Sequence, residues 1–166
     1  MSTLIIIRGN TGSGKTSVAK ALQRKLGRNT LLISQDVVRR DMLWVRDGQN
    51  TDALPLLLAL LHYGQKHCPY VILEGILRAD WYLPLFSTAK KLFSPRIFAY
   101  YYDLSFEETL RRHATKPNHL DFGETEMRRW WTEKDWIATI PETIFTDKTS
   151  FEEALNQIVQ DIGPVC

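Results

Sequence analysis

A run of three isoleucines that ends in a glycine-rich loop is the feature that most constrains how this chain can fold. Residues 5–16 read IIIRGNTGSGKT, so an apolar segment of strand length leads directly into the pattern G-x-x-x-x-G-K-[ST]. Between a strand and a helix, this pattern forms a loop whose backbone N–H groups surround phosphate. Lys15 can reach the β- and γ-phosphates, and the Thr16 hydroxyl can ligate Mg²⁺.

The segment therefore predicts a nucleoside triphosphate site, with ATP and Mg²⁺ as the expected cofactors. Glycine at these positions lets the backbone curl around a phosphate, and the start of the following helix adds partial positive charge. The residues expected to bind the nucleotide are Gly9, Asn10, Thr11, Gly12, Ser13, Gly14, Lys15 and Thr16.

Apolar segments of strand length alternate with helical patterns along the whole chain. The expected strands are 4–9, 30–34, 70–75, 96–104 and 143–147. The expected helices are 14–26, 36–45, 52–67, 81–93, one capped by Ser105 and Glu108, 124–136, and one capped by Ser150 and Glu153 that ends near 162. Such alternation is typical of a parallel sheet covered on both faces. The sequence predicts a single α/β domain over residues 1–166: a three-layer sandwich around a five-stranded parallel sheet, with a small helical lid at about 112–130.

Composition and charge narrow the classes of function. The formal net charge of +2 does not indicate a nucleic-acid or membrane surface. The longest apolar run, Ala53–Leu61, is much shorter than a membrane span. Cys68 and Cys166 have no metal-binding or redox spacing, and the amino-terminal segment does not have the pattern of a signal peptide. These features favour a cytoplasmic protein in a reducing compartment.

Other motifs help to decide what receives the phosphate. A GTPase is expected to carry Asn-Lys-x-Asp late in the chain, but the segment TEKD (132–135) has Thr in place of the Asn. No ABC-type signature is present either. A kinase is therefore the favoured class, and a nucleotide-binding switch or adaptor without transfer activity is the alternative from another class.

The segment ISQDVVRRDML (33–43) supplies a candidate base and candidate acceptor ligands. An Asp at the end of the second strand, followed three residues later by Arg, resembles the polynucleotide 5′-hydroxyl kinase, zeta toxin and chloramphenicol phosphotransferase group. The resemblance implies that Asp36 accepts the proton of the acceptor hydroxyl, and that Arg39 binds acceptor phosphate or orients Asp36. Arg40, the next residue, is a further candidate for binding the acceptor. Independently of this resemblance, an attacking hydroxyl needs a carboxylate within hydrogen-bond reach, beside the γ-phosphate. The alternatives are a helix cap for Asp36 and a solvated helix face for the arginines.

The segment VILEGIL (71–77) places Glu74 at the end of the third strand. A carboxylate there can hold Mg²⁺ directly or through water, so Thr16 and Glu74 are the expected metal ligands. The Glu-Gly pair also resembles uridine and pantothenate kinases. The alternative for Glu74 is an ion pair with a local arginine such as Arg78.

Basic residues gather around the polar segment KPNHLDFG (116–123), which is predicted to be a loop or mobile lid. They are Arg111, Arg112, Lys116, Arg128 and Arg129. Cationic groups that close over the γ-phosphate stabilise the charge of the transition state, and Arg112 and Arg128 are the catalytic candidates. The alternative is a solvated basic face. Trp130, Trp131 and Trp136 can stack on a ring or pack the lid and core.

The sequence thus predicts an ATP-dependent phosphotransferase that acts on a hydroxyl of a small acceptor such as a nucleoside, nucleotide or other metabolite. Polynucleotide 5′-hydroxyl kinase is the alternative within the same class. The segment 46–61 is expected to line the acceptor side, and it is short and rich in leucine. A small acceptor is therefore favoured over a nucleic acid, and no membrane partner is expected.

Overall fold

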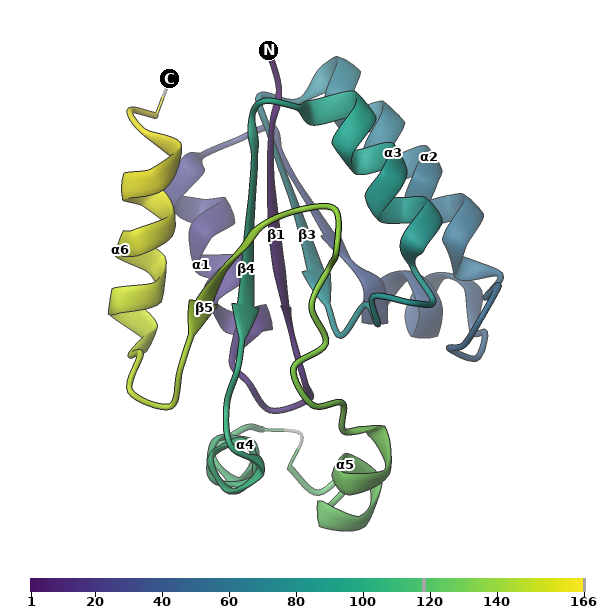
Figure 1. Ribbon diagram of the computed structural model, residues 1–166, viewed down its shortest axis with the longest axis vertical. Coiled ribbons are helices and arrows are strands. Elements are labelled where there is room, and N and C mark those ends of the chain that lie inside the picture. The colour runs from purple at the N-terminus through teal and green to yellow at the C-terminus, as the bar shows by residue number, and fades with distance from the viewer. Residues whose placement is uncertain (118, 166) are drawn as a thin grey trace.

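The computed structural model describes residues 1–117 and 119–165, and a five-stranded parallel sheet forms its centre (Figure 1). The strands are β1 (Thr3–Gly9), β2 (Thr30–Ser34), β3 (Tyr70–Gly75), β4 (Ile97–Tyr102) and β5 (Glu142–Phe145). Their order is β2-β3-β1-β4-β5, and each neighbouring pair is parallel. The predicted three-layer α/β fold is confirmed, with β1 as the central strand.

Helices cover both faces of the sheet. The helices in the described part of the chain are α1 (Lys15–Leu26), the π-helix η1 (Val37–Leu43), α2 (Ala53–His67), α3 (Leu83–Phe93), α4 (Phe106–Ala114), α5 (Glu124–Trp130) and α6 (Phe151–Ile162). In Figure 1, α1 and α6 lie on one side of the sheet, and α2 and α3 lie on the other. Ser150 and Glu153 form the predicted capping box at the start of α6.

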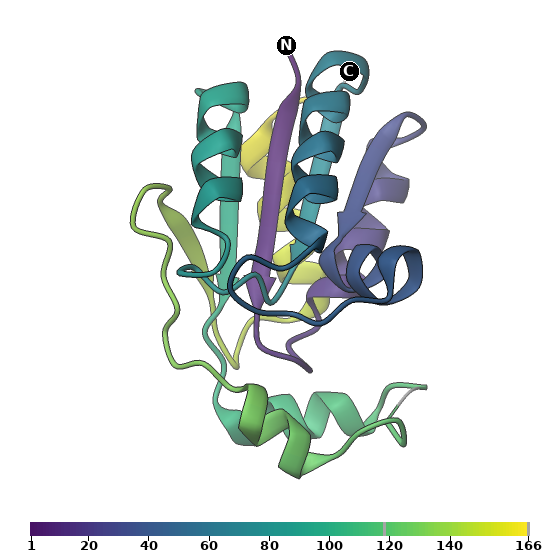
Figure 2. The ribbon, with the colours of Figure 1, turned by 90° about the vertical axis from the view of Figure 1, so that its right-hand side faces the viewer.

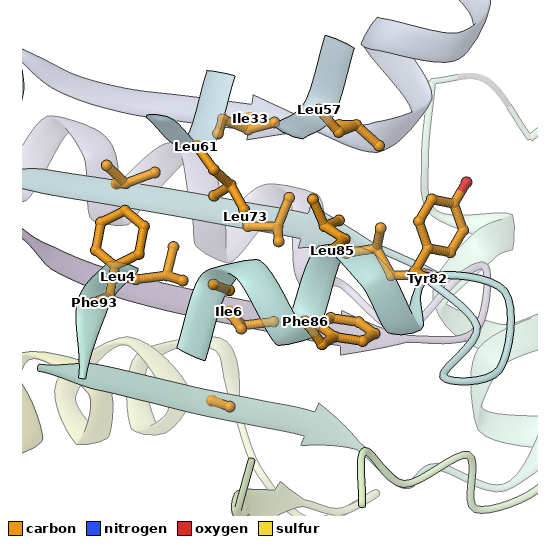
Figure 3. Packing of buried hydrophobic residues seen from close by; sticks show 14 of the residues in the cluster. Leu4, Ile6, Ile33, Leu57, Leu61, Leu73, Tyr82, Leu85, Phe86 and Phe93 are labelled. Atoms are coloured by element: carbon orange, nitrogen blue, oxygen red, sulfur yellow. The ribbon is translucent and has the colours of Figure 1, made fainter. Parts of the chain in front are cut away.

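The alternation of side chains along the central strand divides the core into two layers. Leu4 and Ile6 point toward α2 and α3, where they pack with residues such as Leu57 and Phe86 (Figure 3). Ile5 and Ile7 belong to the second cluster, toward α1 and α6. All four strand side chains are fully buried. Each such burial is worth about 1.5–3 kcal/mol, which explains why an apolar run is required at this position.

Cys68 is a buried free thiol, and the prediction for Cys166 lies outside the described residues.

Two helices differ from their predicted form. The segment after β2 is a π-helix that ends at Leu43, because Trp44 takes a left-handed conformation (φ 54°). Helix α5 ends at Trp130, whereas the pattern predicted a helix to 136. The backbone N–H of Thr132 donates to the Asn10 side chain (2.9 Å), so it does not continue the helical ladder.

The lid lies beyond the carboxyl ends of the strands. Helices α4 and α5 sit below the sheet in Figures 1 and 2, at the end opposite the start of β1. The Ser105 side chain accepts from the backbone N–H of Glu108 (3.2 Å), as the predicted cap requires. The lid and the glycine-rich loop therefore occupy the same end of the sheet.

Candidate active site

A cavity of about 740 Å³ opens at the carboxyl ends of β1, β2 and β3. Its lining comes from the glycine-rich loop, η1, the loops that follow η1 and β3, and the lid. This is the edge of a parallel sheet at which ligands bind in open α/β folds. Predicted site residues from four separate segments of the sequence thus meet at one cavity.

The glycine-rich loop has the conformation that phosphate binding needs. Gly12 and Gly14 have φ of 84° and 94°, in the left-handed region that favours glycine. A Cβ on Gly12 would lie 2.6 Å from the carbonyl oxygen of Thr109, so the loop also packs directly against α4. The hydroxyl of Ser13 is buried without a hydrogen-bond partner among the described residues. The loop therefore fits the phosphates of a nucleotide, because its glycines have no Cβ atoms to keep a phosphate away from the backbone N–H groups.

Lys15 links the loop to both predicted carboxylates. Its side chain is buried, and Nζ donates to the carbonyl oxygen of Asn10 (3.1 Å). Burial lowers the pKa of Lys15, while the negative charges of Glu74 and Asp36 oppose this shift. The ammonium therefore lies within electrostatic reach of the two residues predicted to hold the metal and to act as base.

The side chains of Glu74 and Thr16, the two predicted metal ligands, lie within hydrogen-bonding distance of each other. Glu74 is only 2% exposed, and both of its carboxylate oxygens accept from the Thr16 hydroxyl (3.2 Å each). The predicted alternative, an ion pair with Arg78, is not formed, because Arg78 pairs with Asp80 (2.9 Å). Among residues 1–117 and 119–165, no group of three or more His, Cys, Asp or Glu could hold a metal. The Thr16–Glu74 pair fits Mg²⁺, which takes few protein ligands and completes its shell with phosphate and water.

Asp36 lies on the cavity wall beyond β2, with β3 between its strand and β1. Its side chain makes no capping hydrogen bond at the start of η1, which removes the simplest structural alternative. Instead, it accepts from Arg39 (3.1 Å) and lies 3.7 Å from Arg40. The side chain is 59% exposed, so the carboxylate can be reached from the cavity. The predicted acceptor-side residues are therefore grouped together.

The two predicted lid arginines lie in different settings. Arg112 donates to the carbonyl oxygens of Ser13 (2.7 Å) and Thr149 (3.3 Å), so it holds the glycine-rich loop from outside. Arg128 is exposed, pairs with Glu124 (2.9 Å) and does not contribute to the cavity lining. Its predicted catalytic role remains a prediction, and the neighbouring Arg129 is the arginine of α5 that lines the cavity.

Lys116 is a lid cation on the cavity wall, within electrostatic reach of Lys15. It lines the cavity, and burial together with the positive charge of Lys15 lowers its pKa to about 8. Two of the three predicted tryptophans also line the cavity, namely Trp130 and Trp131. Trp136 lies beyond α5 and packs edge-on against Tyr101. The lid therefore contributes both charge and aromatic surface.

Sequence reasoning missed two groups that hold the site together. The Asn10 side chain donates to the carbonyl oxygen of Thr132 (2.7 Å) and accepts from its backbone N–H (2.9 Å), which ties the loop to the segment after the lid. Arg8 is fully buried and forms ion pairs with Asp135 (2.6 Å) and Glu142 (2.7 Å). A charged residue inside the apolar run IIIRG is the one local signal that could have indicated this network.

Residues 4–138 match a protein-family model described as an AAA domain. Because the match covers most of the chain, the chain belongs to this family. No match to the chain is found among curated protein sequences.

Solved structures with the same fold include several small kinases. An APS kinase from Mycobacterium tuberculosis, in complex with AMPPNP and APS, is 19% identical, with a TM-score of 0.68 over 97% of this chain and 96% of that one. A gluconokinase from Sinorhizobium meliloti is 15% identical, with a TM-score of 0.63 over 96% and 91%. A shikimate kinase from Acinetobacter baumannii, in complex with shikimate, is 18% identical, with a TM-score of 0.60 over 98% and 93%. The fold is thus that of the small P-loop kinases.

Within the described part of the chain, no helix combines the length and apolar character needed to cross a bilayer.

Proposed function

We propose that the protein is an ATP-dependent phosphotransferase that moves the γ-phosphate to a hydroxyl of a small acceptor. The observation that carries this proposal is the convergence of Lys15, Glu74 and Asp36 on one cavity. The glycine-rich loop borders one part of this cavity, and Asp36 with its arginines borders another. Kinases of sugars, shikimate and APS among the structural neighbours support the same class of reaction.

Each side chain has a definite task in this proposal. ATP supplies the phosphoryl group. Thr16 and Glu74 would hold Mg²⁺, which would neutralise part of the charge on the phosphates. Lys15 and the loop N–H groups bind the β- and γ-phosphates. Asp36 accepts the proton of the acceptor hydroxyl as its oxygen bonds to the γ-phosphorus and the bond to the bridging oxygen breaks. The proton rests on Asp36, and ADP is the leaving group.

The lid supplies the remaining positive charge. Lys116 and Arg129 line the cavity and are therefore assigned to the developing charge on the γ-phosphate oxygens. Arg112 is assigned to the loop, because its guanidinium holds the Ser13 carbonyl. Arg128 has no role in this proposal unless the lid rearranges when the nucleotide binds.

The test is a transfer assay with γ-labelled ATP and a panel of nucleosides, sugars, carboxylated alcohols and 5′-hydroxyl oligonucleotides. Lys15→Ala should nearly abolish transfer to any acceptor that the wild type uses, because it removes the charge at the β- and γ-phosphates. Lys25→Ala, on the exposed end of α1, is the matched control and should behave as wild type. Full transfer by a folded Lys15→Ala protein would exclude the kinase reading. A wild type that binds ATP but transfers to none of the panel would favour a switch or adaptor.

A further inference from the structure

The cavity has far more positive charge than the protein as a whole. Its basic lining residues are Lys15, Lys20, Arg39, Arg40, Arg46, Arg78, Lys116 and Arg129. Its acidic lining residues are Asp36, Asp47 and Glu74. Eight cationic side chains against three carboxylates leave an excess of five, whereas the complete chain has a formal net charge of +2. This concentration of charge selects for anionic ligands.

Half of the cationic side chains lie on the acceptor side, away from the glycine-rich loop and the lid. Arg39 and Arg40 belong to η1, Arg46 follows η1, and Arg78 follows β3. The nucleotide has its own ligands in the loop, Lys15 and the lid cations. The four arginines around the acceptor space are therefore not explained by ATP.

The carboxylates on this side offset these arginines only in part, and Asp80 pairs with one of them, Arg78 (2.9 Å). Asp36 is shared between Arg39 and Arg40. Asp47 accepts from the Tyr82 hydroxyl (2.5 Å) and from the Gly48 N–H (2.9 Å), so it is held by groups other than arginine. The positive charge of the acceptor side is thus left in excess.

Two arginines have unused hydrogen-bonding capacity. Arg46 has no ion pair or hydrogen bond from its guanidinium to any described residue. The Arg39 side chain is 15% exposed, and its Nε is buried without a partner among the described residues. A buried donor without a partner is unfavourable, and an acceptor atom of a bound ligand would satisfy it.

Arg78 has a fixed orientation at the same cavity. Its guanidinium lies over the indole ring of Trp81 (4.2 Å to the ring centroid) and donates to the Asp80 carboxylate from Nε (3.1 Å) and Nη2 (2.9 Å). No hydrogen bond from Nη1 to a described residue is formed. A planar guanidinium held in this way can still donate to a phosphate or carboxylate.

We propose that the phosphate acceptor is itself an anion: a small hydroxyl compound that carries a phosphate or carboxylate group bound by Arg39, Arg46 and Arg78. This inference rests on the proposed function, because it names the substrate class of that site. An anionic acceptor would also compete with Asp36 for the Arg39 and Arg40 guanidiniums. Asp36 would then be free to face the acceptor hydroxyl.

The first experiment measures binding without transfer. The protein is saturated with AMPPNP and Mg²⁺, so that the loop is filled, and the affinity for inorganic phosphate is measured by calorimetry. Arg46→Gln and Arg78→Gln should each weaken phosphate binding about tenfold or more, the usual worth of a charge-assisted hydrogen bond. Arg24→Gln, exposed near the end of α1, is the control and should leave the affinity unchanged. Equal affinity in all four proteins would overturn the inference. So would a wild type that neither binds phosphate nor prefers gluconate to glucose in the second experiment.

The second experiment compares transfer to matched compounds: glucose, glucose 6-phosphate and gluconate. The two anions, glucose 6-phosphate and gluconate, should each have a kcat/KM about tenfold or more above that of glucose. Arg46→Gln should reduce this preference. Whichever anion has the higher kcat/KM identifies the group, phosphate or carboxylate, that the site prefers. Preference for glucose would overturn the anionic acceptor while leaving the kinase proposal intact. Phosphate binding that depends on Arg46 and Arg78, without transfer to any acceptor, would overturn the kinase proposal alone.

Discussion

Glu74 and Asp36 both follow parallel strands, but their carboxylates have different surroundings. Glu74 is 2% exposed and bonded to Thr16, whereas the Asp36 side chain is 59% exposed and paired with arginines. A buried oxygen ligand suits a metal site, and an accessible carboxylate suits proton transfer to and from a substrate. These surroundings support the assignment of Glu74 to the metal and Asp36 to the acceptor.

Asp36→Asn separates a catalytic base from a structural carboxylate. Transfer should fall by roughly two to four orders of magnitude, the usual worth of a positioned base, while ATP affinity remains. Stability should change by less than about 1 kcal/mol, since exposed ion pairs contribute little. Rate, nucleotide affinity and denaturation are measured on this variant and on Asp41→Asn, an exposed residue of the same π-helix that does not line the cavity. Unchanged turnover would move the base to another carboxylate, with Glu74 the first to test.

In the proposed site, Lys116 should make nucleotide binding depend on pH. Its pKa is about 8, below the ordinary 10.5, and the charges around it are Lys15, Glu74 and Arg112. The negative triphosphate should raise this pKa, so binding takes up a proton and weakens as pH rises from about 8 to 10. AMPPNP affinity measured across this range should fall less steeply in Lys116→Arg, with any remaining slope due to Lys15. Identical slopes would place Lys116 outside the nucleotide site.

The same shift has a defined effect on stability. Between about pH 8 and 10.5, Lys116 is protonated in the unfolded chain and largely neutral in the ligand-free folded protein. The unfolded state therefore binds more protons, and the contribution of Lys116 to the free energy of unfolding rises as pH increases through this window.

At the residue scale, the sequence motif predicted which residues form the glycine-rich loop. It could not predict in which direction the side chains of the lid helices point. The residues of the glycine-rich loop follow from one continuous motif. The choice among lid cations depends on which way a helix faces, and one residue turns a side chain by about 100° around the axis. Arg128 and Arg129 are adjacent in the sequence, so the sequence alone could hardly distinguish them as lid cations. In the structure Arg128 pairs with Glu124, whereas Arg129 lines the cavity.

At the level of elements, the glycine-rich loop and α4 are in direct contact at Gly12. Gly12→Ala would combine left-handed strain with a Cβ 2.6 Å from the Thr109 carbonyl oxygen. Gly27→Ala carries the same kind of strain (φ 97°) but no atom within 4 Å of the new Cβ. Both should cost about 1–2 kcal/mol from strain, while only Gly12→Ala should displace α4 and abolish nucleotide binding. Calorimetric ATP titration and denaturation compare them, and equal loss of ATP affinity would contradict this coupling.

The elements also show where sequence patterns stop being informative. The strands and the core helices follow from apolar periodicity, which each segment carries within itself. The end of α5 does not follow from local periodicity, because the backbone N–H of Thr132 donates to the side chain of Asn10, 122 residues away in the sequence. The left-handed Trp44 that ends η1 has no glycine or proline to mark it. Both boundaries depend on the folded structure around them.

At the scale of the whole molecule, Arg8 joins the central strand to three distant segments. Besides Asp135 and Glu142, its guanidinium donates from Nε (3.1 Å) and Nη2 (3.0 Å) to the Leu77 carbonyl oxygen. Arg8→Met should destabilise the protein by about 3–5 kcal/mol, because Glu142 is left buried and unpaired.

Adding Glu142→Gln to Arg8→Met should recover part of this loss, since the buried charge is then removed. Urea denaturation of both variants measures the difference. A loss below about 1 kcal/mol in Arg8→Met would mean that water or other side chains replace the network.

The tryptophans give the cavity an optical property. Trp81, Trp130 and Trp131 line it, while Trp44 is 92% exposed and Trp136 lies outside the lining. A compound that enters the cavity changes the polarity around three of the five indole rings. Replacing Trp44 and Trp136 with Phe would leave an emission spectrum that comes from the cavity alone. The protein thus contains its own fluorescent reporter of occupancy, and unlabelled metabolites can be screened by titration before any product is known.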